Sequence, residues 1–218
     1  MTRAVIFDLD GTLIDSAPDI HAAANRLMDR YEFDQFSTAE TRSFIGSGVP
    51  HFIGRCLRAR GREDDTDLRA RLIDDFMADY ENAVSLTRVY PGVPEALSRL
   101  AADHALLGLC TNKPHGPARA VLEHLGLSDY FPVIIGGDSL PVRKPDPAPL
   151  HAAIAGLAAR NVLYVGDSEI DAETALRADV RFALYTEGYR KSPASEIAHA
   201  SAFSDFADLP RIVAKLLP

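Results

Sequence analysis

The feature that most constrains this chain is an apolar run near its start, Ala4–Phe7, that ends in two aspartates. A short run of this kind predicts a strand that is buried on both faces. Asp8 and Asp10 are two residues apart, so an extended chain presents both carboxylates on the same side where the strand ends. Neighbouring carboxylates repel unless a cation lies between them or one of them holds a proton. A polar turn would explain Asp10 and Gly11 alone, so the rest of the chain decides between a turn and a site.

The composition is that of a soluble globular protein, since 47% of the 218 residues are hydrophobic and 25% are charged. This length fits one substantial domain, or a core with a smaller companion. The net charge of −8, with no basic block, argues against nucleic acid as a partner. Cys56 and Cys110 fit no disulfide or metal-ligand pattern and predict small buried side chains in a reducing compartment. We expect a cytoplasmic protein with no membrane association, because the chain shows no signal-peptide pattern and no membrane-spanning stretch.

The segment 16–84 has a helical pattern throughout. Pro18 suits the first turn of a helix, and Ser37 with Glu40 fits a capping box that opens another. Phe44–Gly48 interrupts the pattern, and helical spacing of apolar residues resumes on both sides of a later charged stretch. The sequence therefore predicts a bundle of helices, a cap domain, inserted after the first strand.

The remainder of the chain alternates strands with helices. Further strands are predicted at Leu106–Cys110, Val133–Ile135, Val162–Val165 and Arg181–Tyr185. This alternation indicates an α/β fold, a Rossmann-like, doubly wound parallel sheet with helices on both faces. We assign residues 1–15 and 85–218 to this core and residues 16–84 to the cap.

Polar residues follow the predicted strands at their carboxyl ends. These are Asp8 with Asp10, Thr111 with Asn112, and Asp167 with Asp171, joined by Lys144 in a proline-containing loop. In an open parallel sheet the carboxyl ends meet at one edge, where ligands bind. Residues more than a hundred positions apart are therefore expected to form one site.

The acidic residues suit phosphoryl transfer. A carboxylate such as Asp8 attacks phosphorus as a nucleophile, and Asp10 is placed to exchange a proton with the leaving group and then with water. Asp8, Asp167 and Asp171 offer the hard oxygen ligands that Mg²⁺ prefers. A metal ion also allows an anionic nucleophile to approach an anionic phosphate.

The remaining polar residues suit the phosphoryl oxygens. Thr111 and the backbone N–H of Asn112 are candidate hydrogen-bond donors, and Lys144 supplies a fixed positive charge. Phosphoryl transfer depends mainly on such positioning and charge neutralisation. We therefore expect a small phosphorylated metabolite as the substrate.

Taken together, these motifs resemble those of the haloacid dehalogenase superfamily, in its phosphatase branch. They stand here as Asp8-Leu9-Asp10-Gly11-Thr12, Thr111-Asn112, Arg143-Lys144-Pro145, and Gly166-Asp167 with Asp171. The resemblance covers nearly the whole chain in the expected order. It implies a Rossmann-like core with a helical cap, an aspartyl-phosphate on Asp8, and Mg²⁺ held by Asp8, the carbonyl of Asp10 and Asp167.

A narrower resemblance is to the phosphoglycolate phosphatase family. Ile45-Gly46-Ser47-Gly48 is similar to the cap loop that enters the active site there, which implies a substrate-binding role for Gly46, Ser47 and Gly48. The chain departs from the family at Ser47, where asparagine is expected, and at Asp146, where histidine is frequent. On spacing alone, a plain helix break explains the two glycines equally well.

Several alternatives remain open at this stage. Arg42, His51 and Arg55 are candidates for gripping a substrate carboxylate, or are solvated charges. Within the superfamily, the alternative substrates are pyrophosphate and a sugar phosphate, and the alternative reaction is a phosphoglucomutase-like isomerisation. A phospho-acceptor signalling module also clusters aspartates on such a sheet, but it lacks a helical insertion. Either a monomer or a homodimer is compatible with the sequence.

Overall fold

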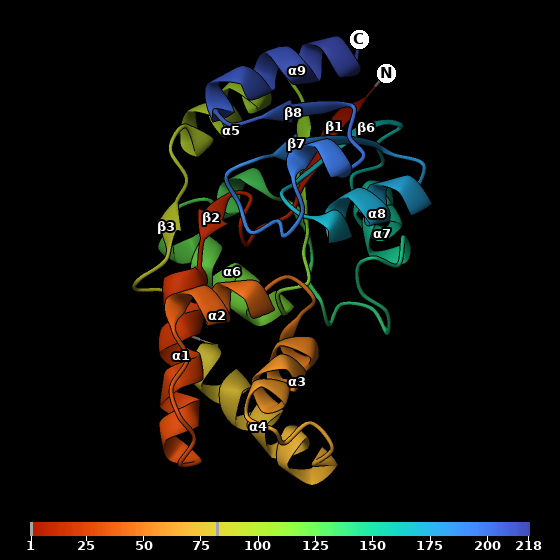
Figure 1. The fold of residues 1–218 in the computed structure, drawn as a ribbon. Helices are drawn as coiled ribbons and strands as arrows, with labels where there is room; N and C mark the ends of the chain where they lie inside the picture. Colours follow the sequence, from red (N-terminus) through yellow and green to blue (C-terminus); the bar gives the residue numbers. More distant parts are fainter. Residues whose placement is uncertain (1, 82) are drawn as a thin grey trace.

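Six parallel strands form the centre of the larger lobe in the computed structural model, which describes residues 2–81 and 83–218 (Figure 1). Their order across the sheet is β5-β4-β1-β6-β7-β8. They span Arg3–Phe7 (β1), Leu106–Cys110 (β4), Val133–Ile135 (β5), Asn161–Gly166 (β6), Arg181–Tyr185 (β7) and Ser201–Phe203 (β8). The predicted doubly wound parallel sheet is confirmed, and the strand that carries the acidic pair is a central one, between β4 and β6.

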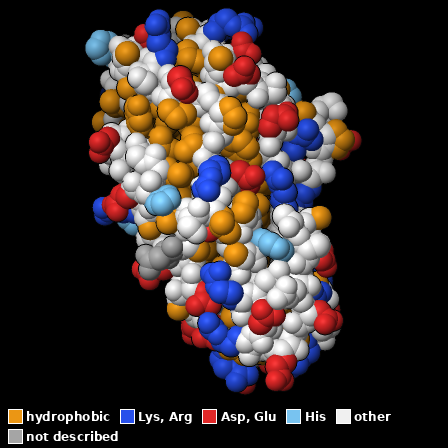
Figure 2. Space-filling view, turned by 90° about the vertical axis from the view of Figure 1, so that its left-hand side faces the viewer, with side chains coloured by type: hydrophobic (Ala, Val, Ile, Leu, Met, Phe, Trp, Pro, Cys, Tyr) orange, Lys and Arg blue, Asp and Glu red, His pale blue; other side chains and the backbone are white. Residues whose placement is uncertain are grey.

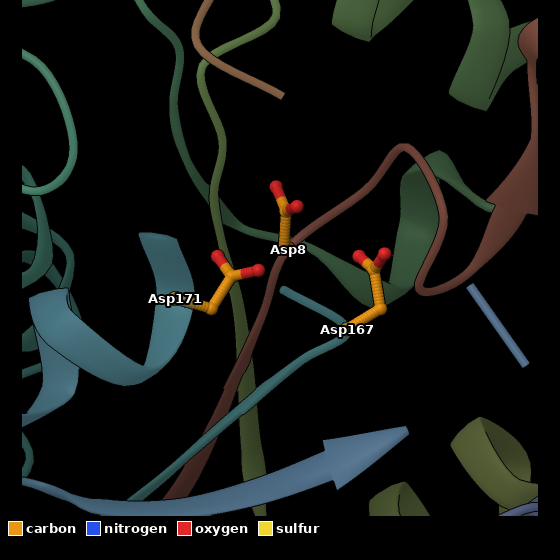
Figure 3. Close-up of side chains that lie close together, drawn as sticks. All are labelled: Asp8, Asp167 and Asp171. Atoms are coloured by element: carbon orange, nitrogen blue, oxygen red, sulfur yellow. The ribbon is translucent and has the colours of Figure 1, made fainter. Parts of the chain in front are cut away.

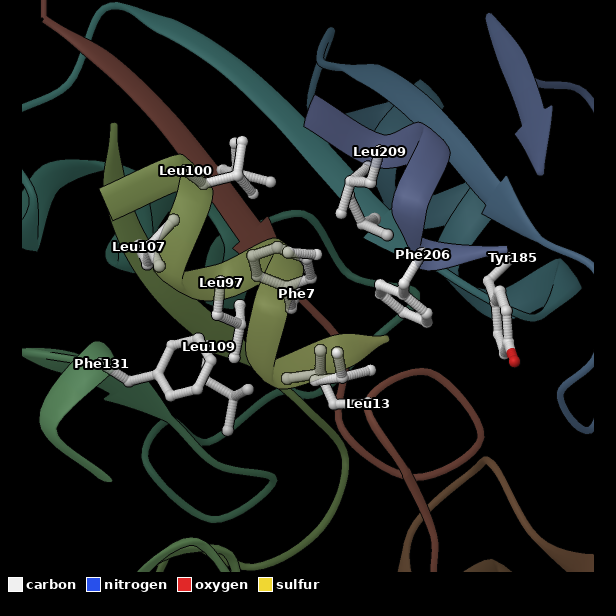
Figure 4. Close-up of a cluster of buried hydrophobic side chains, with 14 of the residues drawn as sticks. Phe7, Leu13, Leu97, Leu100, Leu107, Leu109, Phe131, Tyr185, Phe206 and Leu209 are labelled. Carbon is white, nitrogen blue, oxygen red and sulfur yellow. The ribbon is translucent and has the colours of Figure 1, made fainter. Parts of the chain in front are cut away.

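The alternation of side chains along β1 joins this strand to the cores on both faces of the sheet. Val5 and Phe7 belong to one buried apolar cluster, and Ala4 and Ile6 belong to another. The first is covered by α5 (Val93–Ala102), α6 (His115–His124) and α9 (Leu209–Leu216), and the second by α7 (Ala148–Gly156) and α8 (Glu169–Arg177). Figure 4 shows the first cluster, in which Phe7 lies among leucines from the flanking helices and strands. A strand buried on both faces is therefore held rigidly, as its uninterrupted apolar run predicts.

The cap is a separate helical lobe at the lower end of Figure 1. In the described residues it comprises α1 (Ala17–Arg30), α2 (Thr38–Phe44), α3 (Val49–Ala59) and α4 (Thr66–Tyr80). These helices share an apolar cluster of their own, in which Leu27, Ile53 and Phe76 are buried. The capping box of Ser37 and Glu40 is present at the start of α2, as predicted. The cap therefore has the core of an independent packing unit.

Two short strands stand where the cap joins the core. β2 (Ile14–Asp15) and β3 (Arg88–Val89) pair in antiparallel fashion. The exact division at 15/16 and 84/85 stays a prediction, and Met1 and Asn82, which fall in the predicted ranges, lie outside the described residues.

The remaining elements are peripheral. Short 3₁₀ helices span Ser128–Tyr130, Ala194–Glu196 and Phe206–Asp208. The two ends of the described chain, at residues 2 and 218, lie at the end of the core opposite the cap (Figure 1). In the side view the cap is a narrower lobe with acidic and basic side chains interspersed (Figure 2). None of the described helices has the length and apolar character needed to cross a membrane. Cys56 and Cys110 are buried and unpaired, as predicted.

Asp19 ties the chain entering the cap to the chain leaving it. Its buried carboxylate, on the first turn of α1, accepts hydrogen bonds from the backbone N–H groups of Leu86 (3.0 Å) and Thr87 (2.7 Å). The Thr87 hydroxyl donates a further bond of 2.6 Å to Asp19. Both connections to the cap are thus fixed by one side chain.

Replacing Asp19 therefore tests how firmly the cap is attached. Asp19→Ala leaves these donors without an acceptor in a buried place, and we expect the free energy of unfolding to fall by about 3 kcal/mol. Urea denaturation followed by circular dichroism measures the change. Asp74→Ala, on the exposed face of α4, is the matched control and is expected to change stability by less than about 0.5 kcal/mol. Equal stabilities of the two variants would contradict the role given to Asp19.

Candidate active site

The residues predicted to form a site meet at the carboxyl edge of three neighbouring strands. Asp8 directly follows β1, Thr111 follows β4, and Asp167 follows β6. The loop between β5 and α7 brings Lys144 to within 2.9 Å of Asp8. The convergence expected from the parallel sheet is therefore present, although the chemical role of each residue stays a prediction at this point.

A tight turn after β1 sets the acidic pair against the loop that follows β6. Gly11 has a φ of +89°, and its N–H donates a 2.8 Å bond to the carbonyl of Ile14. A Cβ atom at Gly11 would lie 2.6 Å from a carboxylate oxygen of Asp167, so only glycine fits. The next residue, Thr12, donates a 2.9 Å hydrogen bond to Asp167. This turn therefore fixes the first acidic motif to the last.

Three buried carboxylates form the centre of the site (Figure 3). Oxygen atoms of Asp8, Asp167 and Asp171 all lie within 4.8 Å of one another, and the three side chains come from the end of β1, the loop after β6, and α8. Burial raises the pKa of Asp8 to about 6, against the opposing charge of Lys144. Burial, together with the charges of Asp171 and Asp8, raises the pKa of Asp167 well above its ordinary value. Without a cation nearby, these three buried carboxylates could not all be ionised at once.

Lys144 is the counter-ion of this cluster. Its Nζ lies 2.9 Å from Asp8 and 2.7 Å from Asp171, and it donates a 2.9 Å hydrogen bond to the Tyr164 hydroxyl. Burial alone would lower the pKa of Lys144, but the carboxylates of Asp171 and Asp8 raise it above its usual range. Likewise, burial would raise the pKa of Asp171, but Lys144 and the hydrogen bonds around Asp171 hold it below its usual value. Lys144 is therefore a permanent cation in this site.

The cluster fits a hard divalent cation. Asp8 Oδ1 is buried, and the ion pair with Lys144 Nζ, 2.9 Å away, is its one polar contact among the described residues. A cation beside Asp8 and Asp167 would also offset the burial that raises their pKa values. The donor set is all oxygen, which suits Mg²⁺ and similar ions. Asp171 differs from the other two, since both of its oxygens already accept hydrogen bonds, from Tyr164 and Lys144 on one side and from Ser168 on the other.

A cavity opens between the acidic residues and the cap. The core contributes polar residues to its wall, namely Asp8, Asp10, Thr111, Asn112 and Lys113, together with Pro114. The cap contributes mainly apolar ones, namely Ile20, Ile45, Gly46, Gly48, Val49, Phe52, Phe76 and Tyr80. About 50 Å³ of it is open to the centres of water-sized molecules, which is room for a few waters or one small ligand.

The glycine loop of the cap reaches this cavity. The carbonyl of Gly46 accepts a 3.1 Å hydrogen bond from the side chain of Asn112, and a Cβ atom at Gly48 would lie 3.2 Å from the Asn112 carbonyl. Ser47, between the two glycines, is half-buried and does not line the cavity. The loop therefore contacts the second motif of the core, which a plain helix break would not require.

The arginines considered as carboxylate ligands point elsewhere. The guanidinium of Arg42 lies 4.8 Å from the centre of the Tyr189 ring, and Arg55 donates to the carbonyls of Ser43 and Phe44. Neither arginine, nor His51, belongs to the cavity wall. The geometry therefore gives no support to these three residues as substrate ligands.

Three further residues reach Asp10 or its neighbours and were not predicted. The Ser16 hydroxyl donates a 2.6 Å hydrogen bond to Asp10, and Lys113 Nζ lies 3.1 Å from the same oxygen. Tyr80, at the end of α4, hydrogen-bonds to Lys113. Of the three, only Lys113 had a signal in the sequence, since it directly follows Thr111-Asn112 and shares their strand end.

A parallel sheet with an acidic cluster at its carboxyl edge and a helical insertion over it defines a Rossmann-like enzyme with a phosphoryl-transfer type of site. The chain belongs to the haloacid dehalogenase-like hydrolases, since the model of that family matches residues 5–185.

Two similar relatives carry the name phosphoglycolate phosphatase. The protein from Cereibacter sphaeroides (strain ATCC 17029) is 52% identical over 214 residues, covering 98% of each chain. The protein from Rhodobacter capsulatus is 45% identical and covers 98% of this chain and 97% of the relative. The crystal structure of a predicted phosphoglycolate phosphatase from Haemophilus somnus superposes with a TM-score of 0.89 at 30% identity, covering 97% of each chain.

These comparisons confirm the expected superfamily, the Rossmann-like core with its cap, and the enzyme class of phosphoric monoester hydrolase. They leave no support for a phospho-acceptor signalling module, because family and fold both agree with a hydrolase over nearly the whole chain.

The raised pKa values of the acidic cluster predict pH-dependent binding of a divalent cation. A protonated carboxylate must lose its proton before it binds a metal ion, so binding releases protons and weakens as the pH falls. With the pKa of Asp8 at about 6 and that of Asp167 raised as well, we expect the affinity for Mg²⁺ to fall by at least about tenfold for each pH unit below 6. Calorimetric titrations in buffers of different ionisation enthalpy measure both the affinity and the protons released.

Asp167→Asn serves as the site variant in this titration and is expected to bind Mg²⁺ far more weakly, whereas the surface variant Asp74→Asn is expected to bind like the unaltered protein. An affinity that stays constant between pH 5 and pH 8 would show that these carboxylates are not the ligands.

Proposed function

We propose that this enzyme is a Mg²⁺-dependent phosphatase that hydrolyses 2-phosphoglycolate through an aspartyl-phosphate on Asp8. The observation that carries the proposal is the position of Asp8, which lines the cavity, is held beside Lys144, and keeps a buried oxygen without a hydrogen bond. A carboxylate in such a place is available to form a bond to phosphorus. The names of the relatives at 52% and 45% identity support the choice of substrate.

In the first step, an oxygen of Asp8 attacks phosphorus, and the bond between phosphorus and the glycolate oxygen breaks. Asp10, two residues further on, gives a proton to that departing oxygen, so glycolate leaves as an alcohol. The Ser16 hydroxyl, 2.6 Å from Asp10 Oδ1, helps to hold the acid in place. The product of this step is the aspartyl-phosphate.

In the second step, a water molecule attacks phosphorus from the side that glycolate has left, opposite the Asp8 oxygen. Asp10 takes up a proton from this water. The bond between Asp8 and phosphorus breaks, which releases inorganic phosphate and restores both carboxyl groups. Asp10 thus acts first as an acid and then as a base, and the protons balance over the cycle.

The other residues hold charge and position. Thr111 and the backbone N–H of Asn112 line the cavity and are the proposed donors to phosphoryl oxygens, and Lys144 neutralises the charge around Asp8. Asp8, Asp167 and the backbone carbonyl of Asp10 are the proposed ligands of Mg²⁺. When bound, this ion lowers the repulsion between the nucleophile and the phosphate.

We assign the fourth acidic residue, Asp171, a supporting role rather than that of a metal ligand. Its oxygens are already occupied by Lys144, Tyr164 and Ser168, so it supports the site by fixing Lys144 and the start of α8. The direct ligand role predicted from the sequence is retained only as an alternative to this one.

The cap side of the cavity favours a small substrate. Its wall is apolar, and the small space between the cap and the acidic residues suits one small ligand better than a nucleotide or a hexose phosphate. The glycine loop contributes Gly46 and Gly48 to this wall, and Ser47 is a proposed contact with the bound substrate.

The choice of 2-phosphoglycolate as substrate is tested by measuring phosphate release from a panel of compounds, with Mg²⁺ and with EDTA. The panel contains 2-phosphoglycolate, pyrophosphate, hexose phosphates and nucleotides. The proposal predicts a metal-dependent kcat/KM for 2-phosphoglycolate well above the others, and a flat profile would contradict this substrate.

The nucleophile itself is tested by Asp8→Asn. The amide has the size of the carboxylate but cannot attack phosphorus, so we expect kcat to fall by about 10⁴-fold or more. Circular dichroism and thermal melting check that the variant is folded, and phosphate release measures its activity. The surface variant Asp74→Asn is the control for the same chemical change and should keep full activity. A folded Asp8→Asn enzyme with substantial activity would exclude Asp8 as the nucleophile.

A further inference from the structure

Lys113 is a buried charge that the proposed reaction does not use. It directly follows Thr111-Asn112 at the carboxyl end of β4, and its side chain is only 3% exposed. Burying an ammonium group is costly, so such a side chain is found where it has a charged partner or a ligand. Lys113 also lines the cavity in which the substrate is proposed to bind.

The contacts of Lys113 link the core to the cap. Its Nζ lies 3.1 Å from Asp10 Oδ1, stands 4.4 Å from the centre of the Tyr80 ring, and hydrogen-bonds to the Tyr80 hydroxyl. Burial alone would lower the pKa of Lys113, but Asp10 and Tyr80 raise it above its usual range. Lys113 is therefore a cation that faces the cavity.

The rest of the cavity wall offers no comparable partner for an anion. Among the described residues that line the cavity, Lys113 carries the only positive charge. Lys144 lies behind Asp8, held between Asp8 and Asp171. A second anionic group on a bound phosphate ester therefore finds one ammonium group to pair with.

The position of Lys113 also matches the geometry of a two-carbon substrate. Asp10 must lie next to the oxygen that leaves phosphorus, because it exchanges a proton there. In 2-phosphoglycolate, the carboxylate is attached to the carbon that carries this oxygen. Since Lys113 Nζ is 3.1 Å from Asp10, it lies next to the space that this carboxylate would occupy.

We propose that Lys113 is a specificity-determining residue, which exchanges its ion pair with Asp10 for one with the substrate carboxylate. This inference rests on the proposed function. The exchange leaves Asp10 positioned, because the Ser16 hydroxyl still donates its 2.6 Å hydrogen bond to it. It also removes the positive charge of Lys113 from Asp10, so that the carboxyl group is able to hold the proton that it gives to the leaving oxygen. Tyr80 holds the ammonium group from the cap side, so the cap helps to keep Lys113 aimed at the substrate.

The test compares two substrates that differ in one charge. These are 2-phosphoglycolate and its uncharged amide, 2-phosphoglycolamide, and the measured quantity is the ratio of their kcat/KM values. Lys113→Met removes the charge at nearly constant length. Because a charge-assisted hydrogen bond in a buried site is lost, we expect the ratio to fall by at least about tenfold, mainly through the KM of the acid.

Two further variants complete the design. Lys113→Gln also removes the charge but can still hydrogen-bond to Asp10 and Tyr80, so it replaces the Met variant if that protein does not fold. Lys215→Met makes the same change on the exposed side of α9 and should leave the ratio unchanged.

The outcomes separate this inference from the function on which it rests. If the unaltered enzyme prefers the acid and a folded Lys113 variant has the same ratio of kcat/KM values, the role given to Lys113 is wrong but the proposed function stands. Equal losses for the acid and the amide would also overturn it, because Lys113 would then act only on Asp10. A ratio near one in the unaltered enzyme would show that the proposed substrate is wrong, and the inference would fall with it.

Discussion

The rest of the site depends on the buried ammonium group of Lys144. Carboxylates as close as Asp8 and Asp171 repel strongly in a buried place, and a fixed cation between them allows both to exist there. The two are not treated alike. Asp171 shares its oxygens among several donors and has a lowered pKa, whereas Asp8 keeps a raised pKa and an oxygen without a hydrogen bond. The same lysine thus supports one structural carboxylate and one that remains available for chemistry.

The fold places this interaction where a substrate can be enclosed. β1 is central and buried on both faces, so the acidic pair at its end is held by the packing of the whole core. The helical cap is inserted immediately after this pair, and it returns to the core beside its own starting point, where Asp19 binds Leu86 and Thr87. A lobe attached in this way can cover the site without disturbing the strand that carries the nucleophile.

Much of this arrangement could be predicted from the sequence. The apolar run before Asp8 predicted the buried strand, and the strand ends carrying Thr111 and Asp167 predicted where the site would form, because parallel strands share one carboxyl edge. Signals in single residues, such as the capping box at Ser37 and Glu40, predicted local structure because they act within one turn of the chain.

What the sequence did not predict depends on contacts between distant segments. Ser16 and Tyr80 have no distinctive spacing, and their importance follows from the way the cap folds back onto Asp10 and Lys113. β2 and β3 have two residues each, too short for a periodic pattern. α9 carries an amphipathic pattern at Leu209, Ile212 and Val213 that could have been recognised. Arg42 and Arg55 show the converse: charge near a glycine loop suggested ligands, but the folded chain directs both to other partners.

The central claim is that phosphate passes through Asp8 on its way to water. The stereochemistry at phosphorus tests this most directly, with a chiral, isotopically labelled phosphorothioate analogue of 2-phosphoglycolate hydrolysed in labelled water. Each in-line displacement inverts the configuration, so attack by Asp8 followed by attack by water predicts net retention. Net inversion would mean that water attacks the substrate directly, and it would contradict the aspartyl-phosphate.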